Sequence, residues 1–259
     1  MPDYLDVLAE DAVKSIEDGY YETALEAPAL PASLREAILR SERAPIISEI
    51  KFASPSMGIL RKNCDLKRIA REMEGGGAVG ISVLTEPRHF KGHIKSVTEV
   101  RGQVRVPILM KDIILSPVQI EAASKIGANA VLLIQTLFER GYCEKDFQYM
   151  IEYSHLRGLE VLLEVHTEDE FLSALKTDAD MIGINNRDLK TFKVDLGVTK
   201  RILTKHHAEG RVIVSESGIN GPEDIHFLRE CGVQAFLVGT AIMKANDVKE
   251  KVKELVEAL

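Results

Sequence analysis

Two residues of opposite charge, Glu49 and Lys51, lie inside the otherwise apolar run Ile46–Gly58. The β-branched residues of this run, bounded by prolines at positions 45 and 55, predict a short strand. Side chains two residues apart in a strand point to one face, so both charges face the same way. If that face is a core, burying them is costly unless they are paired. Such a pair fits either catalysis or a structural ion pair, and this stretch alone leaves both readings open.

Charged or polar residues also end three further apolar runs, at Lys111, at Glu164 and at the triplet Ser215, Glu216 and Ser217. These runs belong to a series in which short β-branched segments alternate with amphipathic helical stretches. We expect eight strands, near residues 46–51, 79–84, 107–111, 129–134, 160–165, 180–184, 211–215 and 234–239.

Apolar strands that are each followed by a helix predict a parallel sheet covered by helices. Eight repeats favour an α/β fold with a closed (β/α)8 TIM barrel over an open doubly wound sheet. No Gly-x-Gly-x-x-Gly follows any strand, which weakens the dinucleotide-binding alternative. We expect residues 1–259 to form one barrel domain, with residues 1–44 as an N-terminal helical extension. The extension should cover one end of the barrel, as a stabilising cap or as a functional lid.

The odd-numbered strands carry the charged ends. Alternate strands contribute alternate layers of a barrel interior, so these charges should converge at the C-terminal mouth, where barrels of this type hold their active sites. Together with Arg187, from the turn after the sixth strand, the set has three basic and three acidic members. They are Lys51, Lys111, Arg187, Glu49, Glu164 and Glu216. Such a site is balanced without a metal ion and can accept an anionic ligand by protonating one carboxylate.

Two glycine turns, at Gly218 and at Gly239, follow the seventh and eighth strands, and Thr240 comes directly after the second. Loops at these places often bind phosphate in barrels, because backbone N–H groups point at the anion. Further donors on the same side are Lys51, Ser54 and Arg187. The pattern therefore predicts a small phosphorylated molecule as the substrate.

The composition argues against several kinds of partner. The chain has 33 basic and 40 acidic residues, a net charge of −7, and no basic cluster, which argues against nucleic acid and anionic membranes. No apolar run reaches the length of a membrane span, and the N-terminus lacks the pattern of a signal peptide, so we expect a soluble protein that is not exported. The three cysteines, Cys64, Cys143 and Cys231, are widely spaced and indicate a cytoplasmic location.

The seven histidines do not indicate a metal site, because none has the spacing of paired ligands. His166 lies two residues beyond Glu164, and we predict that it is a residue of the rim rather than a ligand. We therefore expect neither a metal nor another cofactor, and a monomer or weak homodimer.

Six ordered segments carry a family resemblance. They are EIK at 49–51 with SPS at 54–56, SVLTEPRHFKG at 82–92, PILMKD at 107–112, LLEVH at 162–166, GINNRDL at 183–189 and SESGI at 215–219. Together they resemble indole-3-glycerol-phosphate synthase over nearly the whole chain. The resemblance implies a carboxy-lyase of tryptophan biosynthesis that closes the ring of 1-(2-carboxyphenylamino)-1-deoxyribulose 5-phosphate with loss of CO2 and water. It implies no cofactor.

The resemblance also implies roles for single residues. Lys111 is the general acid that gives a proton to the substrate carbonyl as the ring carbon attacks, and Glu164 is the base that assists dehydration. Glu49 holds the lysines in place, and Lys51 binds the substrate carboxylate or acts as a second acid. Asn185 and Ser217 contact substrate hydroxyl or amine groups, and Glu216 has a supporting role. The phosphate is bound by Gly218, Gly239 and Thr240 together with Lys51, Ser54 and Arg187. The aromatic ring is contacted by Phe90, Leu132 and Leu189.

Three positions depart from the family's usual residues. Ile113 stands where phenylalanine is usual, which leaves one aromatic wall of the ring pocket in question. Thr240 replaces a more usual serine, and Phe52 occupies a position that is often basic. None of the three changes removes a proton-transfer residue.

Other readings remain open from the sequence. A lysine at a barrel strand end, here Lys111, is also the amine that a Schiff-base aldolase needs. A non-catalytic phosphosugar-binding barrel would keep the phosphate turns without the chemistry. Another phosphoribosyl isomerase fits the phosphate turns alone, without support from the other segments.

Overall fold

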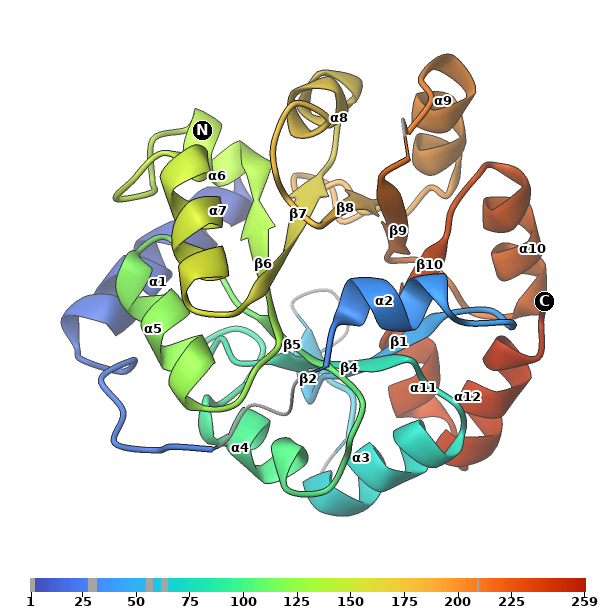
Figure 1. The fold of residues 1–259 in the computed structure, drawn as a ribbon, viewed down its shortest axis with the longest axis horizontal. Helices are drawn as coiled ribbons and strands as arrows, with labels where there is room; N and C mark the ends of the chain where they lie inside the picture. Colours follow the sequence, from blue (N-terminus) through green and yellow to red (C-terminus); the bar gives the residue numbers. More distant parts are fainter. Residues whose placement is uncertain (1–2, 28–31, 55–57, 62–64, 209) are drawn as a thin grey trace.

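Eight parallel strands close into a barrel in the computed structural model, which describes residues 3–27, 32–54, 58–61, 65–208 and 210–259. Each strand pairs with the next along the chain, and β1 closes the ring against both β4 and β10 (Figure 1). The barrel strands are β1 (Ile46–Ile50), β4 (Gly80–Leu84), β5 (Ile108–Lys111), β6 (Ala130–Ile134), β7 (Glu160–Val165), β8 (Met181–Asn185), β9 (Val212–Glu216) and β10 (Ala235–Val238). The predicted TIM barrel is confirmed, and each predicted strand end lies within one residue of the observed end.

Helices cover the outside of the ring (Figure 1). They are α3 (Leu66–Gly75), α4 (Lys95–Arg101), α5 (Pro117–Lys125), α6 (Gln135–Glu139), α7 (Phe147–Leu156), α8 (Glu168–Ala174), α9 (Gly197–Lys205), α10 (Pro222–Glu230), α11 (Thr240–Lys244) and α12 (Val248–Val256). Several begin after a side chain that accepts a backbone N–H of the first turn, which supplies a partner that the helix itself cannot offer. These N-cap residues are Asp65, Ser116, Asp146, Thr167 and Asp247.

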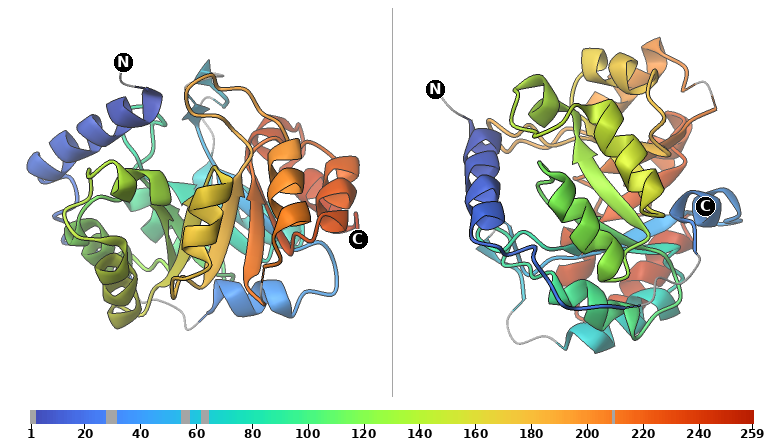
Figure 2. Two further views of the ribbon diagram at one scale, coloured as in Figure 1. Left: turned by 90° about the horizontal axis from the view of Figure 1, so that it is seen from above. Right: turned by 60° about the vertical axis from the view of Figure 1, so that its left-hand side comes forward.

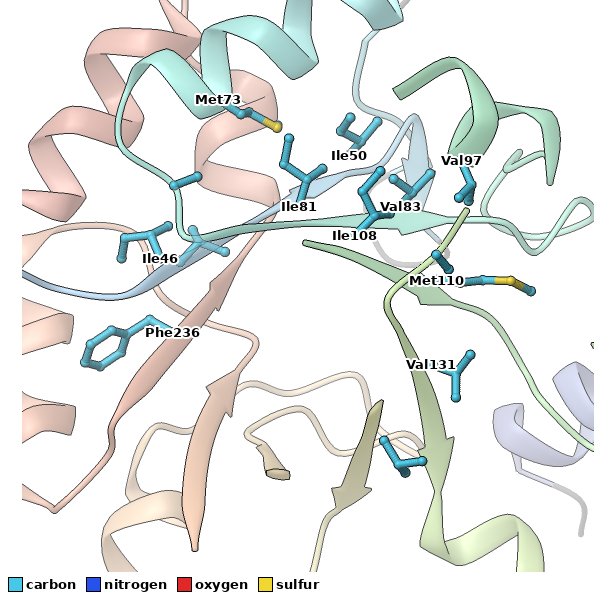
Figure 3. Close-up of a cluster of buried hydrophobic side chains, with 14 of the residues drawn as sticks. Ile46, Ile50, Met73, Ile81, Val83, Val97, Ile108, Met110, Val131 and Phe236 are labelled. Carbon is cyan, nitrogen blue, oxygen red and sulfur yellow. The ribbon is translucent and has the colours of Figure 1, made fainter. Parts of the chain in front are cut away.

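The strands pack on two sides. Ile46 and Ile50 of β1 belong to the apolar layer between strands and helices, together with Met73 of α3 (Figure 3). Ile47, between them, belongs to a second apolar cluster inside the barrel. Because side chains alternate along a strand, Glu49 shares the inward face of Ile47. The same alternation directs the charged strand ends of β5, β7 and β9 into the barrel.

The two N-terminal helices, α1 (Tyr4–Glu17) and α2 (Leu34–Leu39), lie at opposite ends of the barrel (Figure 2). The N-terminus of α2 contacts the first residue of β7, since the backbone N–H of Leu34 donates to Glu160 at 2.6 Å. In contrast, Tyr4 and Leu8 of α1 line the cavity at the other end of the strands. The expectation that the extension covers one end was therefore wrong. Leu34 instead packs into the N-terminal end of the interior, where Gly80 leaves room for it.

A small antiparallel hairpin follows β1, formed by β2 (Ala53–Ser54) and β3 (Gly58–Ile59). The sequence had indicated only a turn here. The side chain of Ser54 and residues 55–57 lie outside the described part of the chain, so the predicted phosphate contact of Ser54 is not described.

Candidate active site

A cavity of about 690 Å³ opens at the C-terminal mouth of the barrel. Its charged wall comes from the ends of β1, β5, β7 and β9 and from the turn after β8. The charged residues predicted to converge all line it, namely Glu49, Lys51, Lys111, Glu164, Arg187 and Glu216. Residues that are as far apart in sequence as 49 and 216 therefore share one pocket.

Lys111 lies at the centre of this wall, between two carboxylates. Its ammonium is 2.5 Å from Oε2 of Glu216 and 3.3 Å from Oε2 of Glu164. Both carboxylates are almost fully buried, at 1% and 4% side-chain exposure, while Lys111 retains 16%. Burial works against the charge of Lys111, but Glu216, Glu164 and Glu49 outweigh it and raise the pKa of the ammonium. The lysine is therefore a charged proton donor and not a free amine at neutral pH.

The two carboxylates around Lys111 differ in their environments. Asn185 donates from Nδ2 to Oε1 of Glu164 at 3.0 Å, and His166 approaches the same oxygen. Burial opposes the charge of Glu164, yet Lys111, His166 and Asn185 outweigh it and lower the pKa of this carboxyl. Burial and the nearby Glu164 instead raise the pKa of Glu216 to about 7, although Lys111 opposes the shift. One site thus holds a carboxyl whose pKa is lowered beside one whose pKa is raised toward neutrality, the usual sign of separate acid and base roles.

Glu49 and Lys51 form a second ion pair at the mouth. Nζ of Lys51 is 2.5 Å from Oε2 of Glu49, with side-chain exposures of 15% and 4%. Gly239 permits this placement, because a Cβ atom there would overlap the Glu49 carboxylate. The resemblance implied that Glu49 holds both lysines. In the structure Glu49 forms an ion pair with Lys51, whereas Lys111 forms its ion pairs with Glu164 and Glu216.

The expected phosphate end of the cavity lies along the loops after β9 and β10. Ser217 and Gly218 both have left-handed backbone angles, with φ of 66° and 89°. A non-glycine residue in this region is uncommon and occurs often at functional sites. Gly239 and Thr240 line the same part of the cavity, as does Lys244, a cation that the sequence did not single out.

Arg187 and Asn185 are held by the loop that follows β8. The backbone N–H of Arg187 donates to Oδ1 of Asn185 at 3.0 Å, and Nη1 of Arg187 donates to the carbonyl of Phe192 at 3.1 Å. Asn185 thus bridges Glu164 and the Arg187 backbone. Asn185 therefore positions the Glu164 carboxylate, which the sequence did not predict, besides its expected contact with substrate.

An apolar wall faces the charged one. Phe90, Leu132 and Leu189 line the cavity, as their implied role with the aromatic ring requires. Ile113 also lines it and is 6% exposed, so the usual phenylalanine position still supplies an apolar surface. Phe52 packs against the apolar layer outside the barrel and does not belong to the wall of the cavity.

Two buried acids, Glu86 and Asp112, also line the cavity, so the balance of three basic and three acidic groups was wrong. Glu86 accepts the backbone N–H groups of the turn that carries Phe90. Asp112 accepts from Thr85, and burial raises the pKa of its carboxyl to about 6. Both acids lie within the segments SVLTEPRHFKG and PILMKD. Because they lie close in sequence to Phe90 and Lys111, their positions could have indicated that Glu86 and Asp112 belong to the cavity.

His166 is not the rim residue that the sequence predicted. Its side chain is only 14% exposed, and its ring lies between Glu164 and Glu170 at the start of α8. Residue 166 has the same parity as Leu162 and Glu164, so the alternation of β7, continued by one residue, also directs its ring inward. That alternation was the signal that could have placed it.

Helix α1 is attached over the mouth by polar contacts. The guanidinium of Arg140, after α6, is 2.7 Å from Oδ1 of Asp6. The ring of His89 lies between Tyr4 and Asp11, with Tyr4 Oη 2.7 Å from Nδ1 and Asp11 Oδ2 2.8 Å from Nε2. The helix therefore closes one side of the cavity and is joined to the turn that carries Phe90.

The described residues contain no group of three or more His, Cys, Asp or Glu side chains placed to hold a metal ion. No helix in the described ranges is long and apolar enough to cross a membrane.

Comparison with known proteins gives a consistent result. A family model described as indole-3-glycerol phosphate synthase matches residues 6–255. The indole-3-glycerol phosphate synthase of Desulforamulus reducens is 43% identical over 224 residues, which are 86% of this chain and 83% of that protein. The one from Caldanaerobacter subterraneus subsp. tengcongensis is 44% identical over 222 residues, covering 84% and 83%. The one from Methanocaldococcus jannaschii is 44% identical over 214 residues, covering 82% and 77%.

Among solved structures, a thiamine phosphate pyrophosphorylase from Pyrococcus furiosus superposes with a TM-score of 0.62 at 18% identity, covering 87% of this chain and 97% of that one. At this identity the likeness supports the barrel fold and nothing about the reaction.

Proposed function

The chain belongs to the indole-3-glycerol phosphate synthase family, a carboxy-lyase family of tryptophan biosynthesis, and from that premise we propose that Lys111 and Glu164 carry the proton transfers of its reaction. The observation that supports this assignment is the charged Lys111 between two buried carboxylates whose pKa values are shifted in opposite directions.

In the first step, the ring carbon that bears the carboxyl group forms a bond to the ketone carbon of the deoxyribulose chain. The ketone oxygen becomes a hydroxyl group by taking a proton from Lys111. CO2 then leaves, and the electron pair of its bond returns to the ring. The raised pKa of Lys111 keeps it protonated until the carbonyl arrives, so the proton to be donated is present.

In the second step, the hydroxyl group takes a proton from the ammonium of Lys51 and leaves as water, and a proton from the carbon next to the nitrogen passes to Glu164 as the new double bond forms. Glu164 suits the base because it is ionised, and Asn185 holds its carboxylate in place. Glu216, the nearest partner of Lys111, can return a proton to the lysine. Lys51 is the second candidate donor, since it also lines the cavity as a charged pair with Glu49.

The lining of the cavity supports a proposal for each end of the substrate. The loops at Gly218 and Gly239 with Thr240, Lys51 and Arg187 would take the phosphate, and Lys244 adds a further cation to the lining. The contact of Ser54 with phosphate stays an expectation from the family resemblance, because its side chain lies outside the described part of the chain. The apolar wall would take the aromatic ring, at Phe90, Leu132, Leu189 and Ile113. Ser217 also lines the cavity and would contact a substrate hydroxyl or amine group.

A direct assay tests the proposal. The chain is mixed with 1-(2-carboxyphenylamino)-1-deoxyribulose 5-phosphate, and indole fluorescence is followed with time. We expect turnover by the unmodified chain and a large loss in a Glu164→Gln variant. Borohydride added with substrate separates acid catalysis from an aldolase, because a Schiff base on Lys111 would be trapped as a covalent adduct. Labelling of Lys111 would overturn the role proposed for it.

We also propose that the chain acts as one domain in the cytoplasm, as a monomer or weak homodimer. Among the described residues, Cys143 and Cys231 are free thiols, and Cys64 lies outside the described part of the chain; the two free thiols are in keeping with a reducing compartment. Sedimentation at micromolar concentration tests the oligomeric state.

A further inference from the structure

The imidazole of His166 is enclosed between two carboxylates from different elements. Its Nε2 is 3.3 Å from Oε1 of Glu164 on β7, and its Nδ1 is 3.7 Å from Oε2 of Glu170 on α8. Neither ring nitrogen is accessible to solvent, and among the described residues neither has a well-aligned hydrogen bond. Buried polar atoms of this kind call for an explanation. The two carboxylates are the partners that the ring nitrogens face.

Glu170 is fixed independently of the imidazole. Its Oε1 accepts from the hydroxyl of Thr136 at 2.6 Å, and its Oε2 accepts from the backbone N–H groups of His166 and Thr167 at 2.5 and 3.3 Å. It is also the third residue of α8 in a capping box with Thr167. The start of the helix therefore holds a negative charge at one edge of the His166 ring. That charge orients the ring so that its other nitrogen faces Glu164.

The charges around His166 favour its protonated form. Burial lowers the pKa of the imidazole, but Glu170, Glu164 and Glu216 together outweigh burial and raise it. The cation that shares this space is Lys111 on β5, which already faces both Glu164 and Glu216. One ammonium therefore serves two carboxylates, and a protonated His166 would add a second positive charge in direct contact with Glu164, 3.3 Å from its Oε1. Glu216 feels this charge only from farther away, and its Oε1 has no hydrogen-bond partner among the described residues.

We infer that His166, oriented by Glu170, is a positioning residue that keeps the Glu164 carboxylate ionised and directed toward Lys111. The inference rests on the proposed role of Glu164 as the base. The same geometry explains how the barrel keeps Glu164 and Glu216, which both contact one lysine, in different protonation states. An imidazole that only fills space would need neither its position between two anions nor a charge.

The test replaces His166 with glutamine, which removes the charge but retains a polar side chain. We expect kcat of His166→Gln at pH 7 to fall about tenfold because Glu164 loses its orientation, which is less than the ~10²–10⁴-fold loss typical of a proton-transfer group itself. KM should stay within about twofold, because His166 is not one of the residues that line the cavity. Loss of the cation raises the pKa of Glu164, so the acid limb of the pH profile of kcat should move up by about one pH unit. Glu170→Gln should move it in the same direction by less.

His206→Gln is the matched control. His206 also pairs with a glutamate of α8, since its Nε2 is 2.8 Å from Oε1 of Glu168, but this pair lies outside the barrel. We expect its acid limb to coincide with that of the unmodified chain. An unchanged acid limb in both His166→Gln and Glu170→Gln would overturn the inference. If Glu164→Gln also keeps full kcat, the proposed role of Glu164 fails as well, so the two failures are distinguishable.

A measurement on the unmodified chain tests the charge of His166 directly. Histidine labelled with ¹³C at Cε1 allows each imidazole to be titrated by NMR, and comparison with His166→Asn assigns the signal. We expect His166 to titrate above the range of histidine in short peptides. Titration at or below that range would contradict the inference.

Discussion

Replacing Lys111 with alanine removes the only ammonium that contacts both Glu164 and Glu216 among the described residues. If Lys111 is the general acid, kcat should fall ~10²–10⁴-fold, and since each factor of ten corresponds to 1.36 kcal/mol, the lost transition-state stabilisation is about 3–5 kcal/mol. KM should stay within about tenfold, because the phosphate loops and the apolar wall remain. Indole fluorescence under steady-state conditions gives both constants. A kcat within a factor of three of the unmodified value would refute the reasoning.

Lys111→Met separates loss of charge from loss of packing, since methionine restores much of the side-chain volume. It should lose as much kcat as Lys111→Ala. Lys125→Ala, at an exposed lysine of α5, is the control and should retain full activity.

Stability provides a second measurement on Lys111→Met. Without the ammonium, the pKa values of Glu164 and Glu216 in the folded chain both rise, so more of the stability contributed by protonated carboxyls is present at low pH and is lost as pH rises. Urea unfolding should therefore show the variant losing stability from pH 5 to pH 8 more steeply than the unmodified chain. Parallel pH dependences would contradict the charge assignment.

Three further changes probe the rest of the mouth. Arg187→Ala should raise KM about tenfold or more with kcat nearly unchanged if the guanidinium binds phosphate, and a steady-state assay showing loss in kcat alone would exclude that role. The raised pKa of Glu216, about 7, means that this group stabilises the fold below pH 4.5 and that the contribution is lost as pH rises toward 7; urea unfolding of Glu216→Gln should lack this slope. Gly183→Ala places a Cβ atom against Oε1 of Glu216 and should push that carboxylate away from Lys111. We expect kcat to fall about tenfold at similar KM, whereas unchanged kinetics would show that the position of the carboxylate does not matter for the reaction.

The barrel could be predicted from the sequence because its signal is repeated. Each strand is a short β-branched run between turn residues. One such run is weak evidence for a strand, but eight of them in order indicate the barrel. Hairpin β2–β3 was missed because two strands of two residues have no periodicity to detect. The positions of α1 and α2 could not be predicted either, since amphipathic helices show that they pack but not against which end of a barrel.

The charged centre of the site was predictable for a different reason. In a barrel, the position of a residue along its strand decides whether its side chain points inward or outward. Once the barrel was inferred, the side chains of Glu49, Lys111 and Glu164 were therefore expected to converge at its C-terminal mouth. The same alternation, continued one residue beyond β7, also directs His166 inward. What the sequence did not show is that Glu170 of α8 encloses the other side of its ring, which takes His166 away from the rim.

The charges that line the cavity explain why some of its carboxyl groups are expected to hold protons. The acidic residues of the lining outnumber the basic ones, and the substrate would bring a phosphate and a carboxylate of its own. The acids are Glu49, Glu86, Asp112, Glu164 and Glu216, and the bases are Lys51, Lys111, Arg187 and Lys244. This excess of negative charge favours the protonated form of some of the carboxyls. Asp112 and Glu216, whose pKa values are raised to about 6 and about 7, are the groups that can do so near neutral pH, which leaves Glu164 as the ionised carboxylate opposite Lys111.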